Sequence, residues 1–366
     1  MKKLIKILII EVILIGIIFS FLLLKDNGFI AIENTFSKNS KKIYEKVEEI
    51  TIDKTKVYSK IEKALLEGEN EVEFKDFSML MKAEEVFSLL DQIVYENPKI
   101  MYYKGAEYRI GKLTISYSKT KEEIKKHQKE IEEIRDDFIA KYISNEMTDY
   151  EKVLASHDYI INNSRYDTRI LDGASLPPES YTSYGVLKLG IGVCEGYAKA
   201  MKYLLDGIGI ESKIVIGLSK EENHAWNLVK LDNEYYHIDA TWDDPVTENG
   251  QDVIRYNYFN LNDEEISRTH SWKREDYPPA NGRKYNYFIY NKLLVYTKNE
   301  LEDRLRNAIL NKESNLLIKI DNIDETIYLA DMIESIAYDN FNRVKLKRFS
   351  FSIDKEYGII YIEFAY

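Results

Sequence analysis

Two stretches of the chain share one succession of apolar and polar patterns, which predicts a repeated α/β module. In residues 54–118 the expected order is helix, strand, helix, strand, strand. The expected elements there are Lys56–Leu66, Glu71–Phe74, Met81–Tyr95, Met101–Arg109 and Lys112–Tyr117. The same order is expected in residues 298–366, over Lys298–Leu310, Asn315–Ile320, Thr326–Tyr338, Val344–Ile353 and Gly358–Tyr366.

Short local matches support this repeat. Ala64-Leu65-Leu66 corresponds to Ala308-Ile309-Leu310, and Tyr95-Glu96-Asn97 corresponds to Tyr338-Asp339-Asn340. Matches this short also arise by chance, so the repeat is a hypothesis that the sequence alone leaves open.

The segments around these modules have their own character. Residues 26–53 are polar and charged and predict a juxtamembrane spacer or helix. Lys119–Ile143 is a charged helical stretch, which we interpret as a solvated linking helix belonging to an N-terminal module of residues 54–144. The C-terminal module is expected to occupy residues 284–366.

The beginning of the chain is strongly apolar. Leu4–Leu24 would span about 30 Å as a helix, which is enough to cross the hydrocarbon core of a bilayer. Lys2, Lys3 and Lys6 place the N-terminus in the cytoplasm. No Ala-x-Ala-like site follows, so we expect residues 1–25 to be an uncleaved signal anchor in the cell membrane, with an extracellular body. A cleaved signal peptide is the alternative.

Composition is consistent with a globular body outside that run. Hydrophobic residues make up 45% of the chain, with 29 tyrosines, which is enough for packed cores. The formal net charge is −11, and acidic and basic residues are interleaved without a basic patch. Nucleic acid is therefore not an expected partner. The sequence does not indicate an oligomeric state.

Cys194 is the only cysteine of the chain, so it cannot form an intrachain disulfide. Loop-like residues precede it, and a helical pattern begins at or beside it. A thiol at a helix N-terminus faces the positive end of the helix dipole, which favours the reactive thiolate. We therefore interpret Cys194 as a nucleophile; a buried apolar filler is the alternative.

A hairpin downstream provides candidates for a base and its orienting carboxylate. Two β-prone runs flank Asp232–Asn233, and a two-residue loop there would put Thr241 opposite His224. Asp239 would then be the diagonal neighbour of His224 on the same face, because side chains alternate along a strand. A carboxylate at this position can accept from one imidazole nitrogen and leave the other for the thiol.

Together these residues resemble a known family. Cys194 in Gly-Val-Cys-Glu-Gly-Tyr-Ala, His224 in His-Ala-Trp-Asn and Asp239 in His-Ile-Asp-Ala-Thr-Trp-Asp-Asp-Pro are similar to the three motifs of the transglutaminase-like domain. That domain belongs to the papain-like thiol enzyme superfamily. The similarity covers residues 145–283, and downstream it includes His270.

The resemblance implies an α+β fold in which a papain/transglutaminase-like thiol domain is flanked by the small α/β modules and preceded by the transmembrane helix. It also implies acyl transfer on a protein, peptide or cell-wall amide through Cys194, His224 and Asp239, either hydrolytic (peptidase or deamidase) or transglutaminase-like. No cofactor is expected. A catalytically silent binding or scaffold protein of the cell envelope is the alternative from a different class.

Other residues are weaker candidates for the site. Tyr184 lies before the nucleophile and could reach a substrate oxyanion, whereas Tyr197 fits the wall or core. Trp226 and His237 lie in the hairpin and are candidate supporting residues. A metal site that includes Cys194 is not expected, because the paired ligand spacing typical of such sites is missing.

Overall fold

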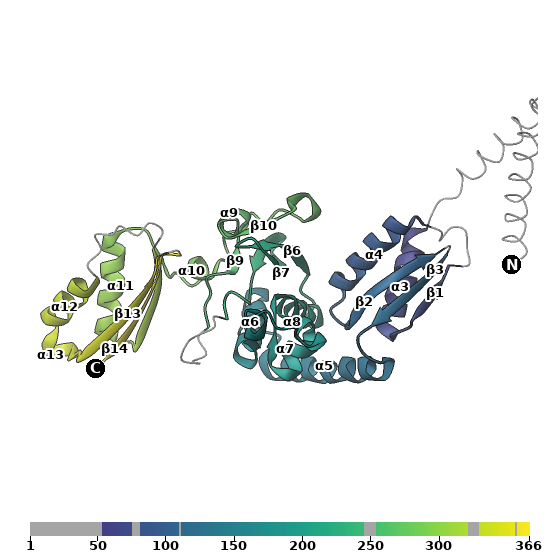
Figure 1. Cartoon of the computed structure of the whole chain (residues 1–366). Coiled ribbons are helices and arrows are strands. Elements are labelled where there is room, and N and C mark those ends of the chain that lie inside the picture. The colour runs from purple at the N-terminus through teal and green to yellow at the C-terminus, as the bar shows by residue number, and fades with distance from the viewer. Residues whose placement is uncertain (1–52, 75–80, 110, 245–253, 321–328, 356) are drawn as a thin grey trace, which may run out of the picture. The chain divides into compact units, whose positions relative to one another are not determined.

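The structure is a computed structural model that describes residues 53–74, 81–109, 111–244, 254–320, 329–355 and 357–366 (Figure 1). The expected anchor, residues 1–25, and all but the last residue of the expected spacer lie outside these described residues. Within the described residues, no helix is both long and apolar enough to cross a membrane. The chain divides into two compact units, Met1–Val57 with Phe74–Met81 and Tyr58–Glu73 with Lys82–Tyr366, and nearly all of the fold below belongs to the second.

The first α/β module has the predicted order of elements. Its helices and strands are α3 (Lys54–Glu67), β1 (Glu71–Glu73), α4 (Ala83–Glu96), β2 (Tyr103–Arg109) and β3 (Lys112–Tyr117). The strands are antiparallel and lie in the order β1-β3-β2. Leu113 and Ile115 of β3 are buried and alternate with exposed Thr114 and Ser116, so one face of this sheet forms a core.

The C-terminal module repeats this topology. Its elements are β11 (Leu294–Val295), α11 (Lys298–Asn311), β12 (Asn315–Ile320), α12 (Leu329–Asp339), α13 (Phe341–Val344), β13 (Arg348–Asp354) and β14 (Ile359–Ala365). The strand order is β11-β12-β14-β13, in which β12, β14 and β13 correspond to β1, β3 and β2 of the first module. The shared order of antiparallel strands supports the repeat that the sequence suggested. The strand expected from Val344 begins only at Arg348, because a helical turn, α13, precedes it.

Helices and a sheet make up the central part of the chain. The helical elements are α5 (Lys121–Tyr142), α6 (Asp149–Asn163), η2 (Thr168–Ile170), η3 (Pro178–Tyr181), α7 (Ser183–Leu189), α8 (Cys194–Gly207), α9 (Asp263–Ile266), η4 (Arg274–Asp276) and α10 (Tyr287–Tyr290). The strands are β4 (Arg165–Tyr166), β5 (Ile191–Gly192), β6 (Ser212–Ser219), β7 (Glu222–Leu231), β8 (Glu234–Ile238), β9 (Phe259–Leu261) and β10 (His270–Trp272). Five of these strands form an antiparallel sheet in the order β10-β6-β7-β8-β9.

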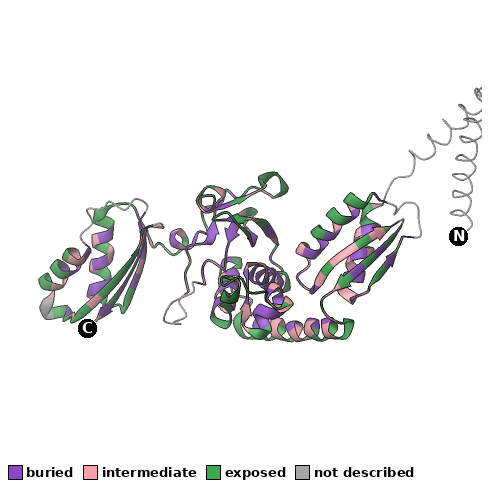
Figure 2. Cartoon of the chain, in the orientation of Figure 1, coloured by how far each residue is buried: buried purple, intermediate pink, exposed green. Residues whose placement is uncertain are grey.

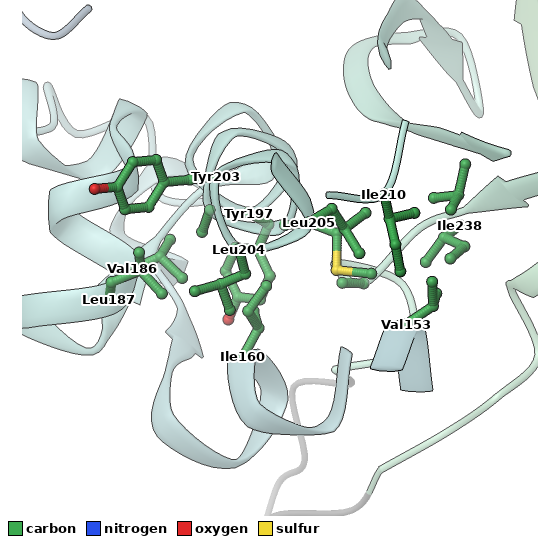
Figure 3. Close-up of a cluster of buried hydrophobic side chains, with 14 of the residues drawn as sticks. Val153, Ile160, Val186, Leu187, Tyr197, Tyr203, Leu204, Leu205, Ile210 and Ile238 are labelled. Atoms are coloured by element: carbon green, nitrogen blue, oxygen red, sulfur yellow. The ribbon is translucent and has the colours of Figure 1, made fainter. Parts of the chain in front are cut away.

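Helix α8 is the centre of the main core. Tyr197, Leu204 and Leu205 on α8 pack in one cluster with Val153 of α6 and Val186 of α7 (Figure 3). All of these side chains are buried, and Figure 2 shows the buried residues gathered along the inner sides of the helices. The helix that begins at the cysteine is therefore fixed along its length by apolar contacts.

Helix α5 differs from the solvated linker expected at Lys119–Ile143. It begins as the sequence suggests, because Thr120 and Glu123 form a reciprocal pair of cap hydrogen bonds. However, Ile124, Ile131 and Phe138 are buried in the same cluster as α8. The correction has a simple cause: these apolar residues are seven apart and form one side of a helix whose other sides are charged.

Candidate active site

Cys194 is the first residue of α8 and is partly exposed, as the sequence pattern predicted. Two backbone hydrogen bonds hold the residues that precede it. The Asp167 amide donates to the Gly192 carbonyl at 2.8 Å, and the Val193 amide donates to the Ser180 carbonyl at 2.9 Å. The thiol is therefore presented at a helix N-terminus by a fixed loop.

Two glycines of the cysteine motif allow this close packing. A Cβ atom at Gly196 would lie 2.7 Å from the Ser180 carbonyl oxygen, and one at Gly192 would lie 2.5 Å from Cγ2 of Val186. A larger residue at either position would push the start of α8 away from its neighbours. The glycines thus have a packing role beside the thiol.

Strand β7 supplies His224. It pairs with Gly217 of β6, next to a hairpin turn in which Lys220 and Glu221 have φ values of 49° and 70°. The His224 side chain is only 9% exposed. Its ring stacks at 22° to the ring of Trp226, which is two residues further along the strand and on the same face.

The hairpin between β7 and β8 has the predicted two-residue loop. Leu231 pairs with Glu234, and the loop residues Asp232 and Asn233 have φ values of 49° and 67°. Positive φ at both central residues is what a type I′ turn requires. The register of this part of the hairpin is therefore as predicted.

The far end of the hairpin differs from the prediction that Thr241 lies opposite His224. The strand pairing ends at Asn227 and Ile238, because the chain turns immediately after β8. The turn is closed by a hydrogen bond of 3.2 Å from the Asp243 amide to the Asp239 carbonyl. Asp239 consequently belongs to a turn and not to a strand.

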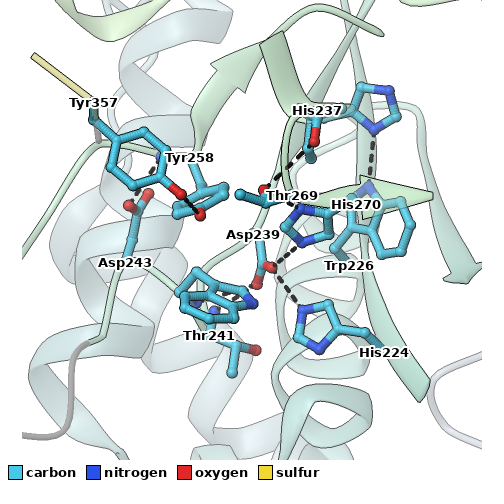
Figure 4. Close-up of polar contacts among 12 residues, drawn as sticks. His224, Trp226, His237, Asp239, Thr241, Asp243, Tyr258, Thr269, His270 and Tyr357 are labelled. Atoms are coloured by element: carbon cyan, nitrogen blue, oxygen red, sulfur yellow. Dashed lines mark hydrogen bonds and ion pairs between the residues drawn. The ribbon is translucent and has the colours of Figure 1, made fainter. Parts of the chain in front are cut away.

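Asp239 nevertheless lies beside His224, as expected. His224 Nε2 donates to Asp239 Oδ2 at 2.6 Å (Figure 4). Burial lowers the pKa of His224, but the charge of Asp239 and hydrogen bonds with Asp239 and Cys194 outweigh it and raise that pKa to about 10. Since Nε2 is bound to Asp239, Nδ1 is the nitrogen left for the thiol.

Asp239 itself is fully buried and ionised. Burial would raise its pKa, yet the charge of His224 and the hydrogen bonds from His224 and His270 hold the pKa well below its usual range. His270 Nε2 lies 3.0 Å from Asp239 Oδ2. His270 falls inside the family resemblance, but the sequence assigns it no role, because no spacing rule links β10 to the turn after β8.

Trp226 and His237, two of the weaker candidates, contact one another. Trp226 Nε1 donates to His237 Nδ1 at 2.9 Å, and His237 Nε2 lies 2.8 Å from Asp263 Oδ1. Burial outweighs the hydrogen bond that His237 donates to Asp263 and lowers the pKa of His237. His237 is therefore a neutral imidazole that holds the indole of Trp226 in place beside His224.

The two tyrosine candidates have partners of their own. The ring of Tyr184 stacks on His127 of α5 at a centroid distance of 3.8 Å, so its contacts give no support to a role at a substrate oxyanion. The Tyr197 hydroxyl donates to Asp244 Oδ2, and burial raises the pKa of Tyr197 far above its usual range. Tyr197 is a core residue of α8 with a buried polar end, as the sequence suggested.

One group of side chains in the described part of the chain has the composition of a metal site. His224, Asp239 and His270 each offer one ligand atom, and these atoms lie within 4.8 Å of one another. The two hydrogen bonds to Asp239 Oδ2 already account for this approach. We therefore interpret the group as hydrogen-bonded side chains and not as metal ligands. The expectation that the chemistry needs no metal or cofactor stays a prediction.

Comparison with known proteins agrees with this geometry. Residues 136–240, which include Cys194, His224 and Asp239, match the family model described as the transglutaminase-like superfamily. This segment is a transglutaminase-like domain. The match begins inside α5, before the boundary at residue 145 that was expected for the transglutaminase-like domain.

Individual proteins are similar to this chain at low sequence identity. The human kyphoscoliosis peptidase is 23% identical over 186 residues, which cover 45% of this chain and 28% of that protein. A TGase of known structure is 16% identical, with a TM-score of 0.30 over 50% of this chain and 52% of that one. A candidate cysteine protease from Cytophaga hutchinsonii is 19% identical, with a TM-score of 0.26 over 30% of this chain and 37% of that one. The chain thus spans under a third of the curated relative and about half or less of these two structures.

Proposed function

We propose that this protein is a thiol acyl-transfer enzyme that acts on peptide or carboxamide bonds. In this proposal Cys194 is the nucleophile, His224 the general base and Asp239 the carboxylate that orients it. The observation that carries the proposal is that His224 hydrogen-bonds a buried carboxylate, Asp239, at 2.6 Å and that the partly exposed Cys194 thiol helps to raise the pKa of His224. The three residues come from α8, from β7 and from the turn after β8. They are therefore brought together by the tertiary fold and not by the geometry of one helix or hairpin.

The proposed reaction begins with proton transfer from the Cys194 thiol to His224 Nδ1. The thiolate sulfur then attacks the carbonyl carbon of the substrate, and the carbonyl π electrons move onto oxygen. As the C–N bond breaks, His224 returns its proton to the leaving nitrogen, and ammonia or an amine departs. A thioester on Cys194 remains. Asp239 stabilises the imidazolium during both steps through the bond to Nε2.

The second half of the reaction decides the product. If water attacks the thioester, His224 accepts a proton from it and the products are a carboxylic acid and the free thiol. If a primary amine attacks, the product is a new amide, as in crosslinking. We propose hydrolysis of peptide or cell-wall-linked amides, because water is the most abundant acceptor in an open extracellular site.

We further propose that the apolar run of residues 4–24 anchors the protein in the cell membrane with its body outside. This part of the proposal rests on sequence alone, namely on the apolar run and the lysines that precede it. An anchored protein should stay with membranes after a high-salt wash and should be released by detergent. Recovery of a soluble form starting near residues 26–35 would instead indicate a cleaved signal peptide.

The decisive experiment compares the full chain with Cys194→Ala on peptide and cell-wall fractions. Released ammonia, new amino groups and crosslinked species would be measured separately, since each reports one reaction type. We expect the variant to lose all of these products while its thermal unfolding stays close to that of the wild type, because a small thiol contributes modestly to packing. Retained activity in Cys194→Ala would exclude the assigned nucleophile. Equal binding of cell-wall material by both proteins, without any product, would favour the scaffold alternative.

A further inference from the structure

One carboxylate oxygen is shared by two histidines. Asp239 Oδ2 lies 2.6 Å from Nε2 of His224 and 3.0 Å from Nε2 of His270 (Figure 4). An ionised carboxylate only accepts hydrogen bonds, so both Nε2 atoms carry a hydrogen and donate it. The proposed triad is therefore extended by a second imidazole that shares Oδ2 of Asp239 with His224.

The other carboxylate oxygen is also fully used. Asp239 Oδ1 accepts from the backbone amides of Thr241 at 3.0 Å and Trp242 at 3.2 Å. With two donors on each oxygen, the buried carboxylate has its acceptor sites filled and its plane fixed. His270 provides the one side-chain donor in this set besides His224.

His270 is itself held from several sides. It begins β10, where it pairs with Ser219 of β6, and its side chain is completely buried. Its Nδ1 lies 2.8 Å from the Thr269 hydroxyl, which is the partner of the second ring nitrogen. The ring of Trp226 approaches it edge-on at a centroid distance of 4.9 Å, and that of Tyr258 at 5.5 Å. A residue so enclosed touches Asp239 and not a substrate.

We propose that His270 is a positioning residue for the acyl-transfer reaction: its Nε2–H fixes the Asp239 carboxylate so that this group can orient His224. The proposal rests on the proposed function of Cys194, His224 and Asp239. It adds a residue on a separate strand, 46 positions beyond His224 in the chain.

Two physical effects follow from this hydrogen bond. First, the donor prevents the carboxylate from rotating about its Cβ–Cγ bond, so that Oδ2 stays in line with His224 Nε2. Secondly, a hydrogen bond to the charged form of a carboxylate favours that form. Asp239 thus remains a charged acceptor while His224 carries the proton taken from Cys194. Loss of His270 would weaken the orientation of His224 without removing any group that contacts a substrate.

The test uses iodoacetamide, since alkylation reports the reactivity of the Cys194 thiolate without knowledge of the substrate. The full chain is alkylated at pH 7 in parallel with Asp239→Asn, His270→Leu, His270→Gln and His270→Asn. We expect His270→Leu to react about tenfold to a hundredfold more slowly than the wild type, by analogy with the loss seen when the hydrogen-bond partner of a metal-binding side chain is removed. A glutamine amide can place its nitrogen near the position of Nε2, whereas an asparagine amide reaches only near Nδ1. His270→Gln should therefore recover most of the reactivity, and His270→Asn should not.

A control removes a half-buried imidazole elsewhere in the fold. His127→Leu eliminates a histidine that hydrogen-bonds Tyr102 and stacks on Tyr184, with no contact to Asp239, and should alkylate at the wild-type rate. Wild-type reactivity in His270→Leu alongside slow alkylation of Asp239→Asn would overturn the role of His270 and leave the proposed function standing. Reactivity no faster than that of glutathione in the wild type, unchanged in Asp239→Asn, would overturn both. Should His270→Leu fail to fold, the glutamine and asparagine variants decide, and equal rates for those two would refute the proposal.

Discussion

His157 Nε2 on α6 and Asp243 Oδ2 in the turn after β8 lie 3.1 Å apart, and neither side chain is exposed. The second ring nitrogen of His157 lies 3.0 Å from Asp158 Oδ1. Burial raises the pKa of Asp243 to about 6, so above that pH both partners are carboxylates, which only accept. The imidazole then carries a hydrogen on both nitrogens and is charged. Asp243 is four residues after Asp239, so this buried ion pair ties the turn that holds the proposed orienting carboxylate to a helix of the core.

The first prediction concerns the pH dependence of folding stability. Burial lowers the pKa of His157, but hydrogen bonds to Asp158 and Asp243 outweigh it and raise the pKa to about 9. A group whose pKa is raised on folding stabilises fully below its unfolded value of about 6.5, and this stabilisation is lost as pH rises through the folded value. The free energy of unfolding should thus fall by up to about 3 kcal/mol between about pH 6.5 and 9 on account of this one residue.

Thermal unfolding of the wild type and of His157→Asn between pH 6 and 10 would measure this contribution. We expect the difference in Tm between the two proteins to shrink as the pH rises, because the variant has no imidazolium to lose. A difference that stays constant across the range would show that His157 is neutral in the folded protein.

The second prediction concerns Asp239→Asn. An amide cannot stabilise the imidazolium and can select the wrong tautomer of His224, so turnover should fall strongly, by about 10⁴-fold if the loss resembles that of a serine triad. The negative charge of Asp239 raises the pKa of His224. Its removal should therefore shift the high-pH loss of activity to lower pH, since the imidazolium deprotonates earlier. The pH profile of kcat/KM would be compared with that of Asp276→Asn, a half-exposed aspartate paired with Lys273, which should behave as wild type.

The third prediction concerns the glycine next to the nucleophile. Gly196→Ala puts a Cβ atom 2.7 Å from the backbone oxygen of Ser180, which cannot move freely. We expect a loss of about 1–3 kcal/mol in the free energy of unfolding, as for other overpacked sites. Gly207→Ala, at the other end of α8, is the comparison, because its nearest neighbours are atoms of the Arg135 side chain. Urea unfolding should show the larger loss for Gly196→Ala, and equal losses would contradict the backbone contact.

The fourth prediction concerns the indole beside His224. Trp226→Phe keeps an aromatic ring but removes the N–H that donates to His237 Nδ1 at 2.9 Å. The buried acceptor on His237 is then unpaired, which should cost about 1–3 kcal/mol of stability. A double variant with His237→Leu has no unpaired acceptor, so its loss of stability should be less than the sum of the two single losses. Additive losses would show that the hydrogen bond does not couple the two residues.

Local patterns predicted the elements of the fold well. The strand Asn315–Ile320 and the start of α8 at Cys194 coincide with the predictions, because each has an uninterrupted pattern of apolar residues or a clear loop before it. The hairpin loop at Asp232–Asn233 was also predictable, since both residue types tolerate positive φ. These features depend on neighbours in sequence.

Features that depend on distant segments were not predictable in the same way. The turn after Ile238 replaced the expected strand pairing of Thr241, because contacts of Asp243 with His157 and with the Tyr258 amide draw the chain away from β7. His270 reaches Asp239 only because β10 pairs with β6 and forms an edge strand of the five-stranded sheet. The burial of the apolar residues of α5 was not predicted for the same reason, since the residues that they pack against lie on helices later in the chain.

The repeated module has one difference with consequences for self-association. In the described part of the first module, the sheet ends at β1, a strand of three residues in which Glu71 and Glu73 are exposed. In the second module the corresponding strand, β12, is covered by the added parallel strand β11. Open strand edges can template pairing with other chains, and short length, charge and coverage all oppose this. The two copies therefore protect the same edge by different means, so neither offers a long apolar strand there for edge-to-edge aggregation.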